Sequence, residues 1–167
     1  LKTKDLQLKT VSLSAVSDSV SPFLLQGDIT GLAAGQIVLD TLSWRLAQAD
    51  SVLVYGMKLA NLPSNSLNMG MAELSGRWYG NLLDMDFSEI DQDGNTGFSF
   101  KSRLEYMDSL LTYKYLTFDP ILGFERWSIN PDNYISYGFD GTILADFRLS
   151  GKDKKFWVYS TENNGVQ

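Results

Sequence analysis

Residues 124–160 read FERWSINPDNYISYGFDGTILADFRLSGKDKKFWVYS, and they predict short β-strands joined by turns. The NPDN segment at residues 130–133 favours a turn, because proline fixes φ and Asn and Asp side chains bond their own backbone. Apolar and polar residues then alternate over residues 143–149, which is the period of a strand with one buried face. A second polar turn leads into residues 156–159. The stretch therefore predicts an antiparallel unit of three short strands.

The rest of the chain continues this alternation, and no segment has a convincing helical pattern of full length. The clearest hairpin joins residues 79–87 to residues 98–106 through a polar turn at residues 91–95. In its first arm the pattern places Tyr79 on the apolar face, with Leu83, Met85 and Phe87, and Trp78 on the opposite face. The spacing of such segments predicts about ten strands.

The predicted fold is all-β, an antiparallel meander in a single domain over residues 1–167. Residues 61–65, which include Pro63, are expected to form a loop between two strands. Each strand offers one apolar face, which must be covered by a second sheet, by the same sheet curled on itself, or by a bound apolar ligand. The residues alone favour a closed sandwich or barrel over an open sheet.

Composition excludes several classes of function. The chain has no histidine and no cysteine, which excludes a Ser-His-Asp triad, a histidine proton shuttle and a His/Cys zinc site. The net charge is −6 and no basic stripe is present, so we expect no nucleic-acid partner. The sequence contains no apolar run long enough to span a membrane. We expect a protein without enzymatic activity, cofactor or metal ion.

Residues 124–160 also resemble the C-terminal part of TamB-like proteins (the AsmA/TamB group) of the type found in Bacteroidetes. In that family an aromatic–hydrophobic–Asn-x-Asp-Asn-Tyr segment precedes an amphipathic strand, a polar turn and a strand ending in Tyr-Ser. The matching residues here are Trp127, Ile129, Asn130, Asp132, Asn133, Tyr134, Ala145, Asp146, Val158, Tyr159 and Ser160. A weaker match lies within residues 87–98. The turn at residues 150–155 departs from the pattern, which has a more acidic and glycine-richer turn there.

The resemblance implies a sheet curved into an open trough, or β-taco, with apolar side chains inside. It implies a fragment of a longer periplasmic protein of a Gram-negative bacterium, anchored in the inner membrane through a segment outside this sequence. The implied function is that of a non-enzymatic section of a periplasm-spanning conduit that supports outer-membrane biogenesis. Its partners would be phospholipid or nascent outer-membrane protein, and a TamA-type outer-membrane barrel reached through the parent protein.

On this interpretation the apolar groove binds acyl chains or nascent outer-membrane strands through side chains of the alternating faces. The predicted groove residues are Leu53, Tyr55, Met57, Met69, Met71, Leu83, Met85, Phe87, Phe98, Phe100, Leu104, Tyr113, Phe147 and Leu149. The simpler interpretation is that these residues form an ordinary core.

The alternative function is a carbohydrate-binding β-sandwich that uses exposed aromatic side chains. The candidates are Trp44, Trp78, Trp127 and Trp157, together with the tyrosines. Aromatic residues on a sheet are more often core or cross-strand partners, which weakens this reading.

Two acidic motifs have simpler structural explanations. Asp84 and Asp86, with Glu89, could be paired carboxylates of a glycosidase, but Asp84 and Asp86 have the i, i+2 spacing of the solvated polar face of a strand. Residues 91–95 suggest a calcium loop, but Thr96 and Ser102 stand where an EF-hand needs glycine and an acid. We therefore expect an ordinary hairpin turn there and no metal site.

Overall fold

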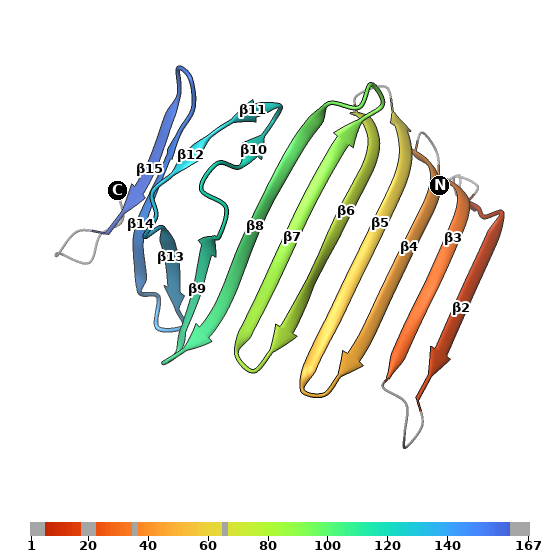
Figure 1. Ribbon diagram of the computed structural model, residues 1–167, viewed down its shortest axis with the longest axis horizontal. Helices are drawn as coiled ribbons and strands as arrows, with labels where there is room; N and C mark the ends of the chain where they lie inside the picture. Colours follow the sequence, from red (N-terminus) through yellow and green to blue (C-terminus); the bar gives the residue numbers. More distant parts are fainter. Residues whose placement is uncertain (1–5, 18–22, 35–36, 65–66, 161–167) are drawn as a thin grey trace, which may run out of the picture.

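The computed structural model describes residues 6–17, 23–34, 37–64 and 67–160. Over these residues the protein is all-β, and no helix is present. All the described strands belong to one antiparallel sheet of 15 strands (Figure 1). The predicted open antiparallel meander is confirmed, with more strands than the expected number of about ten because the C-terminal part contains several very short ones.

The strands run in chain order through most of the sheet. Their bounds are β1 (Leu6–Gln7), β2 (Thr10–Val16), β3 (Leu24–Ala34), β4 (Ile37–Ala49), β5 (Val52–Ser64), β6 (Leu67–Tyr79), β7 (Leu82–Asp91), β8 (Thr96–Met107), β9 (Leu110–Tyr115), β10 (Ile121–Leu122), β11 (Glu125–Arg126), β12 (Ser128–Ile129), β13 (Tyr134–Gly138), β14 (Ile143–Ser150) and β15 (Lys155–Tyr159).

The topology leaves the sheet with two separate edges. Consecutive strands from β3 to β9 are neighbours, so this part is a simple meander. β1 and β2 both pair with β3 at one edge, and β15 pairs with β14 at the other. Between β9 and β13 the chain turns back, so that β10 pairs with β8 and β12 pairs with β14. Since the two edges do not pair with each other, the sheet is open (Figure 1).

Three of the hairpins have two-residue turns. Asp50 begins the turn between β4 and β5, Gly80 the turn between β6 and β7, and Asp108 the turn between β8 and β9, with φ of 54°, 56° and 52°. Positive φ at such positions gives the primed turns whose twist matches that of the flanking strands. Local turn chemistry therefore fixes the register of these hairpins.

The register aligns apolar side chains in rows across the sheet. One row runs through Trp44, Met57, Leu74, Phe87 and Phe100, each opposite the next on neighbouring strands. Because side chains alternate along a strand, all residues in such rows point to one side. We call this side the apolar face. Its further members include Leu25, Ile29, Leu42, Leu46, Leu53, Tyr55, Leu83, Met85, Phe98, Leu104, Tyr113, Tyr115, Ile135, Ala145, Phe147, Leu149, Phe156 and Val158.

The opposite side, called the polar face, carries charged and hydroxyl side chains in the intervening rows. One such row runs through Asp28, Ser43, Lys58, Glu73 and Ser88. Lys58 and Glu73 form an ion pair at 2.7 Å within it. A neighbouring row contains a second ion pair, at 2.9 Å, between Asp86 and Lys101. This face is therefore built to meet water or a polar partner.

The sheet has no second layer to cover the apolar face within the described residues. The chain exposes 11422 Å² to solvent, whereas a globular monomer of its mass would expose about 8,300 Å². Few large apolar side chains are buried: the buried hydrophobic residues are Leu39, Ala72, Ile129, Ala145 and Phe147. The fold is therefore a single-layer sheet with an accessible apolar side.

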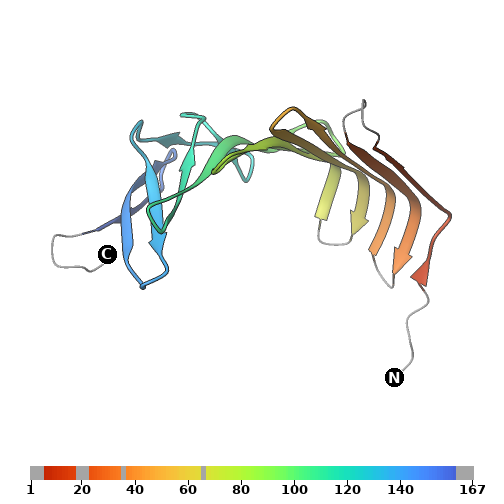
Figure 2. The same cartoon turned by 90° about the horizontal axis from the view of Figure 1, so that it is seen from below.

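Figure 2 shows that the sheet is bent into an arch. The rings of Tyr115 and Phe147 lie 5.9 Å apart, centroid to centroid, although β13 lies between their strands β9 and β14. Strands that flank a common neighbour lie about 9.5 Å apart in a flat sheet. The two rings converge, so the apolar face is on the inner side of the bend in this region.

Two local predictions were wrong. Residues 61–65 were expected to be a loop, but β5 continues to Ser64, with Asn61 at a φ of 52° absorbing the irregularity. Trp78 was expected on the other face of the sheet from Leu83. In the structure the two residues are cross-strand partners, and both lie on the apolar face. The turn of two residues pairs Tyr79 with Leu82, which puts Tyr79 on the polar face.

Candidate functional site: the apolar face

Most of the predicted groove residues lie together on the apolar face. They are Leu53, Tyr55 and Met57 on β5, Leu83, Met85 and Phe87 on β7, Phe98, Phe100 and Leu104 on β8, Tyr113 on β9, and Phe147 and Leu149 on β14. The sheet brings these residues from distant parts of the sequence onto one continuous surface, which extends over the arch from β3 to β15.

Two of the predicted groove residues, Met69 and Met71, are not placed on the apolar face by the strand pairing. Met71 lies opposite Ala60 and Ile90, in a row of the polar face. Met69 lies beyond a register shift between β6 and β7, where strict alternation fails. Gly70 makes the shift possible, because a Cβ at this position would collide with the Asp91 carbonyl oxygen. The sequence pattern could not place these two methionines, because a bulge changes which side a residue faces.

Several apolar-face residues were missing from the predicted set. Leu42, Trp44 and Leu46 on β4 lie on this face next to β5, but they were absent from the predicted groove. Trp78 was assigned to the opposite side because residues 79–87 were predicted to form one arm of a hairpin, whereas Gly80 and Asn81 form a turn between Tyr79 and Leu82. The signal for this turn is Gly80, whose φ of 56° is that of a primed turn.

In the long-strand region, aromatic rings lie flat across neighbouring strands where glycines make room. A Cβ at Gly76 would lie 2.6 Å from the hydroxyl oxygen of Tyr55, which donates a hydrogen bond to the Asp84 carbonyl at 2.9 Å. A Cβ at Gly27 would collide with the Trp44 indole in the same way. Burial, followed by the charge of Asp84, raises the pKa of the Tyr55 hydroxyl. These pairs form a smooth aromatic floor rather than a deep pocket.

Toward the C-terminal part, ring contacts form a continuous chain. Phe87 contacts Phe100 at 5.4 Å, and Phe100 contacts Tyr115 at 5.3 Å. The chain continues through Tyr115 and Phe147 to Phe156, with the last pair at 6.2 Å. Burial raises the pKa of the Tyr115 hydroxyl above its ordinary value, and nearby Tyr113 adds to this. The rings stabilise the inner side of the bend and give it an apolar lining.

The face remains accessible along most of its length. Met57 is 40% exposed and Trp78 is 55% exposed, whereas Phe147 is only 7% exposed. Exposed apolar patches larger than a few hundred Å² are rare on monomeric soluble proteins and mark interaction sites. The arrangement can take up apolar material over a broad surface without covalent chemistry.

One acidic residue lies on this otherwise apolar face. Glu89 is opposite Ala72 and Phe98, is buried, and its Oε2 has no hydrogen-bond partner. Burial, followed by the charge of Asp91, raises the pKa of the Glu89 carboxyl. The side chain is therefore poised to take a proton more readily than an ordinary glutamate.

The other acidic candidates are occupied by structural contacts. Asp84 accepts hydrogen bonds from Arg103 Nη2 at 3.1 Å and Arg77 Nε at 3.2 Å, and the Arg103 contact lowers the pKa of this carboxyl. Asp91 accepts from the backbone N–H groups of Asp93 and Asn95 at 2.9 and 2.7 Å, which forms the expected turn. Nowhere in the described ranges do three or more acidic side chains come together to hold a metal ion.

The turn at residues 130–133 also has a structural role. Asn133 Oδ1 accepts from the Tyr115 N–H at 2.7 Å, and its Nδ2 donates to the carbonyls of Tyr115 and Asn130. Asn130 does the same for β14: its Oδ1 accepts from the Arg148 N–H, and its Nδ2 donates to the Asp146 carbonyl. The side-chain amides of Asn130 and Asn133 thus bond the backbones of β14 and β9 just before β13 begins, in place of the backbone groups of a strand.

Comparisons with known proteins add no family assignment. No protein-family model matches the chain, and neither a curated protein nor a solved structure matches it. Among the described residues, no helix long and apolar enough to cross a membrane is found.

Proposed function

We propose that the apolar face binds the acyl chains of phospholipids, and that the protein is a non-enzymatic section of a lipid-handling conduit. The observation that carries this proposal is a single-layer sheet whose apolar side stays accessible along most of the sheet. Covering one large apolar side chain stabilises a complex by about 1.5–3 kcal/mol when its burial is complete. A surface with this many half-exposed side chains therefore favours an apolar ligand.

Acyl chains suit the face better than nascent protein strands do. A polypeptide must satisfy its backbone N–H and C=O groups, and the interior of an apolar face offers no partners for them. An acyl chain needs only apolar contact. An incoming strand would instead find hydrogen-bonding groups at the open edges of the sheet, along β2 and β15. We therefore assign lipid to the face and leave strand pairing to the edges.

The wider setting belongs to the same proposal. The resemblance of residues 124–160 to TamB-like proteins supports a periplasmic section of a longer, membrane-anchored protein that works with a TamA-type barrel. The curved sheet with its apolar inner side agrees with such a trough. On this proposal, acyl chains slide along the aromatic floor while their headgroups remain in water.

The test uses the tryptophans of the apolar face as contact sensors. A short-chain phospholipid with brominated acyl chains is titrated below its micelle concentration, and tryptophan emission is recorded. We expect saturable quenching that disappears when Trp44 and Trp78 are both replaced by Phe. The substitution Met85→Asp should weaken binding at least about tenfold, because it puts a charge on the apolar face.

The control for this substitution is Ser88→Asp, which puts the same charge on the polar face of the same strand. It should leave lipid affinity unchanged, and circular dichroism must show that both variants are folded. Equal affinity of a folded Met85→Asp variant, or quenching that persists without Trp44 and Trp78, would rule out the proposal.

Carbohydrate binding remains a second candidate because of one exposed aromatic site. Trp157 is 56% exposed and lies opposite Arg148, beside a hollow of about 540 Å³ that Asp146 also lines. A planar aromatic ring beside hydrogen-bonding side chains is the arrangement that sugar rings stack upon. Titration with oligosaccharides, comparing the wild type with Trp157→Ala, separates this candidate from lipid binding, which does not use Trp157.

A further inference from the structure

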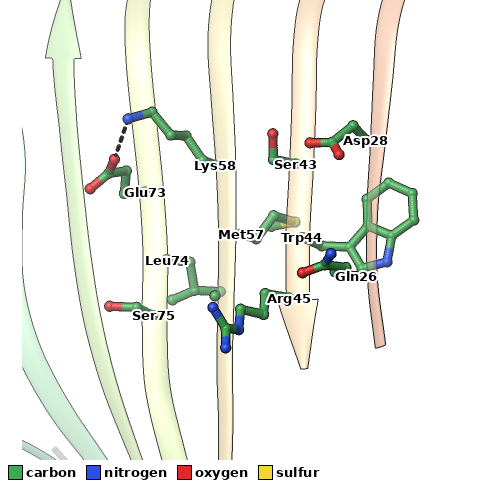
Figure 3. Close-up of a pocket in the computed structure, with 11 residues that line it drawn as sticks. Gln26, Asp28, Ser43, Trp44, Arg45, Met57, Lys58, Glu73, Leu74 and Ser75 are labelled. Atoms are coloured by element: carbon green, nitrogen blue, oxygen red, sulfur yellow. Dashed lines mark ion pairs between the residues drawn. The ribbon is translucent and has the colours of Figure 1, made fainter. Parts of the chain in front are cut away.

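A hollow of about 410 Å³ lies over β3 to β6, and Gly56 on β5 is one of its lining residues. Figure 3 shows the side chains around it. Gly56 pairs regularly with Arg45 and with Ser75, so it marks neither a bulge nor a turn. By strand alternation eight of its lining residues lie on the polar face, and the other three, Trp44, Met57 and Leu74, belong to a row of the apolar face.

The fold itself gives no reason for glycine at position 56. Other described glycines have a positive φ, as Gly31 and Gly80 do, or have neighbours that a Cβ would press against, as Gly27 and Gly76 do. Gly56 alone among the described glycines shows neither: its φ is not positive and nothing lies within 4 Å of an added Cβ. Glycine also weakens a strand interior, where it often marks the close approach of a ligand.

The charges around the hollow leave one cation without an ionic partner among the described residues. Lys58 is paired with Glu73 at 2.7 Å, and Asp28 accepts a hydrogen bond from the Ser12 hydroxyl at 3.3 Å. Arg45 forms no ion pair with any residue of the described ranges. Figure 3 shows its side chain extending from β4 toward β5, the strand on which Gly56 is the cross-strand partner of Arg45.

These observations together point to an anion. We propose that this hollow binds a small hydrophilic molecule carrying one oxyanion group, held by the Arg45 guanidinium. A guanidinium offers several N–H donors in a fork that matches such oxygens. Ser43 and Ser75 add hydroxyl groups at the same site. Asp28 and Glu73 also line the hollow, so a singly charged group fits better than a polyphosphate.

The experiment is an NMR titration of the ¹⁵N-labelled chain with three probes. They are dimethyl phosphate, which carries one charge, its neutral counterpart trimethyl phosphate, and vesicles containing phosphatidylglycerol. We expect dimethyl phosphate to shift the amide signals of Gly56 and Arg45 saturably, and trimethyl phosphate to leave them unchanged. Equal shifts with the two small probes, or no saturable shift with the charged one, would overturn the proposal. The vesicle arm shows whether a lipid headgroup can also supply the oxyanion.

Two variants separate binding from folding. Arg45→Gln should lower the affinity for dimethyl phosphate about tenfold or more, while the matched change Arg77→Gln, elsewhere on the polar face, should not. Gly56→Thr should raise the Tm, because Thr suits a strand, and should abolish binding by filling the hollow. Retained binding in Gly56→Thr, or a lowered Tm that reveals a need of the fold for glycine, would each refute the site. Lipid quenching of Trp44 and Trp78 is a separate readout, so failure of either proposal is distinguishable.

Discussion

The long strands β4 to β8 and the short strands β9 to β15 both carry an apolar face, but they cover it to different extents. β4, β5 and β6 have 13 residues each, whereas β10 has 2 and β14 has 8. In the short-strand region, Ile129, Ala145 and Phe147 are buried. In the long-strand region, Leu39 and Ala72 are buried while Met57 and Trp78 remain exposed, and the short-strand region likewise exposes Phe156. The short-strand region thus buries one aromatic ring of the apolar face, that of Phe147, whereas the indole of Trp78 in the long-strand region stays accessible to solvent.

The two regions also differ in the path that the chain takes after β9. After β9 the chain returns toward β8, and Pro120 is fully buried there. Trp127 donates its indole N–H to the Leu122 carbonyl at 3.1 Å and fixes this segment. In the long-strand region, two-residue turns join β4 to β5 and β6 to β7, and residues 92–95 join β7 to β8. Connection length therefore separates the two regions: the segment between β9 and β13 is long enough to bury a residue of its own, whereas the two-residue turns are not.

The largest effect on stability should come from removing the buried ring of Phe147. Phe147→Ala is expected to lower the free energy of unfolding by about 3–5 kcal/mol, because a buried phenylalanine is removed and a cavity remains. Leu46→Ala, at a half-exposed position of the long-strand region, should cost clearly less. Urea denaturation followed by circular dichroism measures both. Equal losses would mean that the long strands carry a hidden core as well.

Next in size is the loss of an amide that replaces strand pairing. Asn133→Ala should cost about 1–3 kcal/mol, because the Tyr115 N–H and carbonyl lose their partner in a buried place. Asn81→Ala is the control, since it removes one exposed hydrogen bond to the Tyr106 carbonyl in the long-strand region. If thermal unfolding shows the same small change for both, the short-strand region does not depend on this contact.

The smallest effect concerns the charge on the apolar face. Folding raises the pKa of the Glu89 carboxyl, so the folded state binds this proton more tightly than the unfolded chain does. The stabilisation that comes from protonated Glu89 is therefore fully present at low pH and is lost as pH rises through the folded pKa. Glu89→Gln should therefore be more stable than the wild type at pH 7, and the two should converge below the ordinary carboxyl pKa. Unfolding measured as a function of pH checks this. A variant that is less stable at neutral pH would show that the ionised carboxylate is needed.

Much of the long-strand region was predictable from sequence, because its structure depends on local signals. Alternation placed Leu83, Met85 and Phe87 on one face, and the acidic turn ending β7 lies where its residues predicted. Alternation gave the wrong side for Trp78, because a turn at Gly80 and Asn81 separates it from Leu83 within the stretch that was predicted to be one strand. It could not place Met71 either, since the bulge arises from contacts between strands.

The short-strand region was harder to predict for a different reason. Its pairs, such as Ile121 with Ser99 and Ile129 with Leu149, join segments that are far apart in the sequence. Alternation within a segment reports which residues share a face, but it contains no information on which segment lies alongside. The hollow over Gly56 was likewise not foreseen, since it requires knowing that Arg45 and Ser75 flank this glycine.

The pairing of β4 to β7 only with the strand before and the strand after has a consequence for how the protein opens. A sheet of this kind is nearly one-dimensional, and its stability is a sum of strand terms and neighbour terms, as in repeat proteins. Unfolding then starts at a free edge and advances strand by strand, as a zipper does. Amide hydrogen exchange should be fastest in β2 and slow progressively toward β7. The outermost strands are therefore where we expect local unfolding to begin and where another strand could be added.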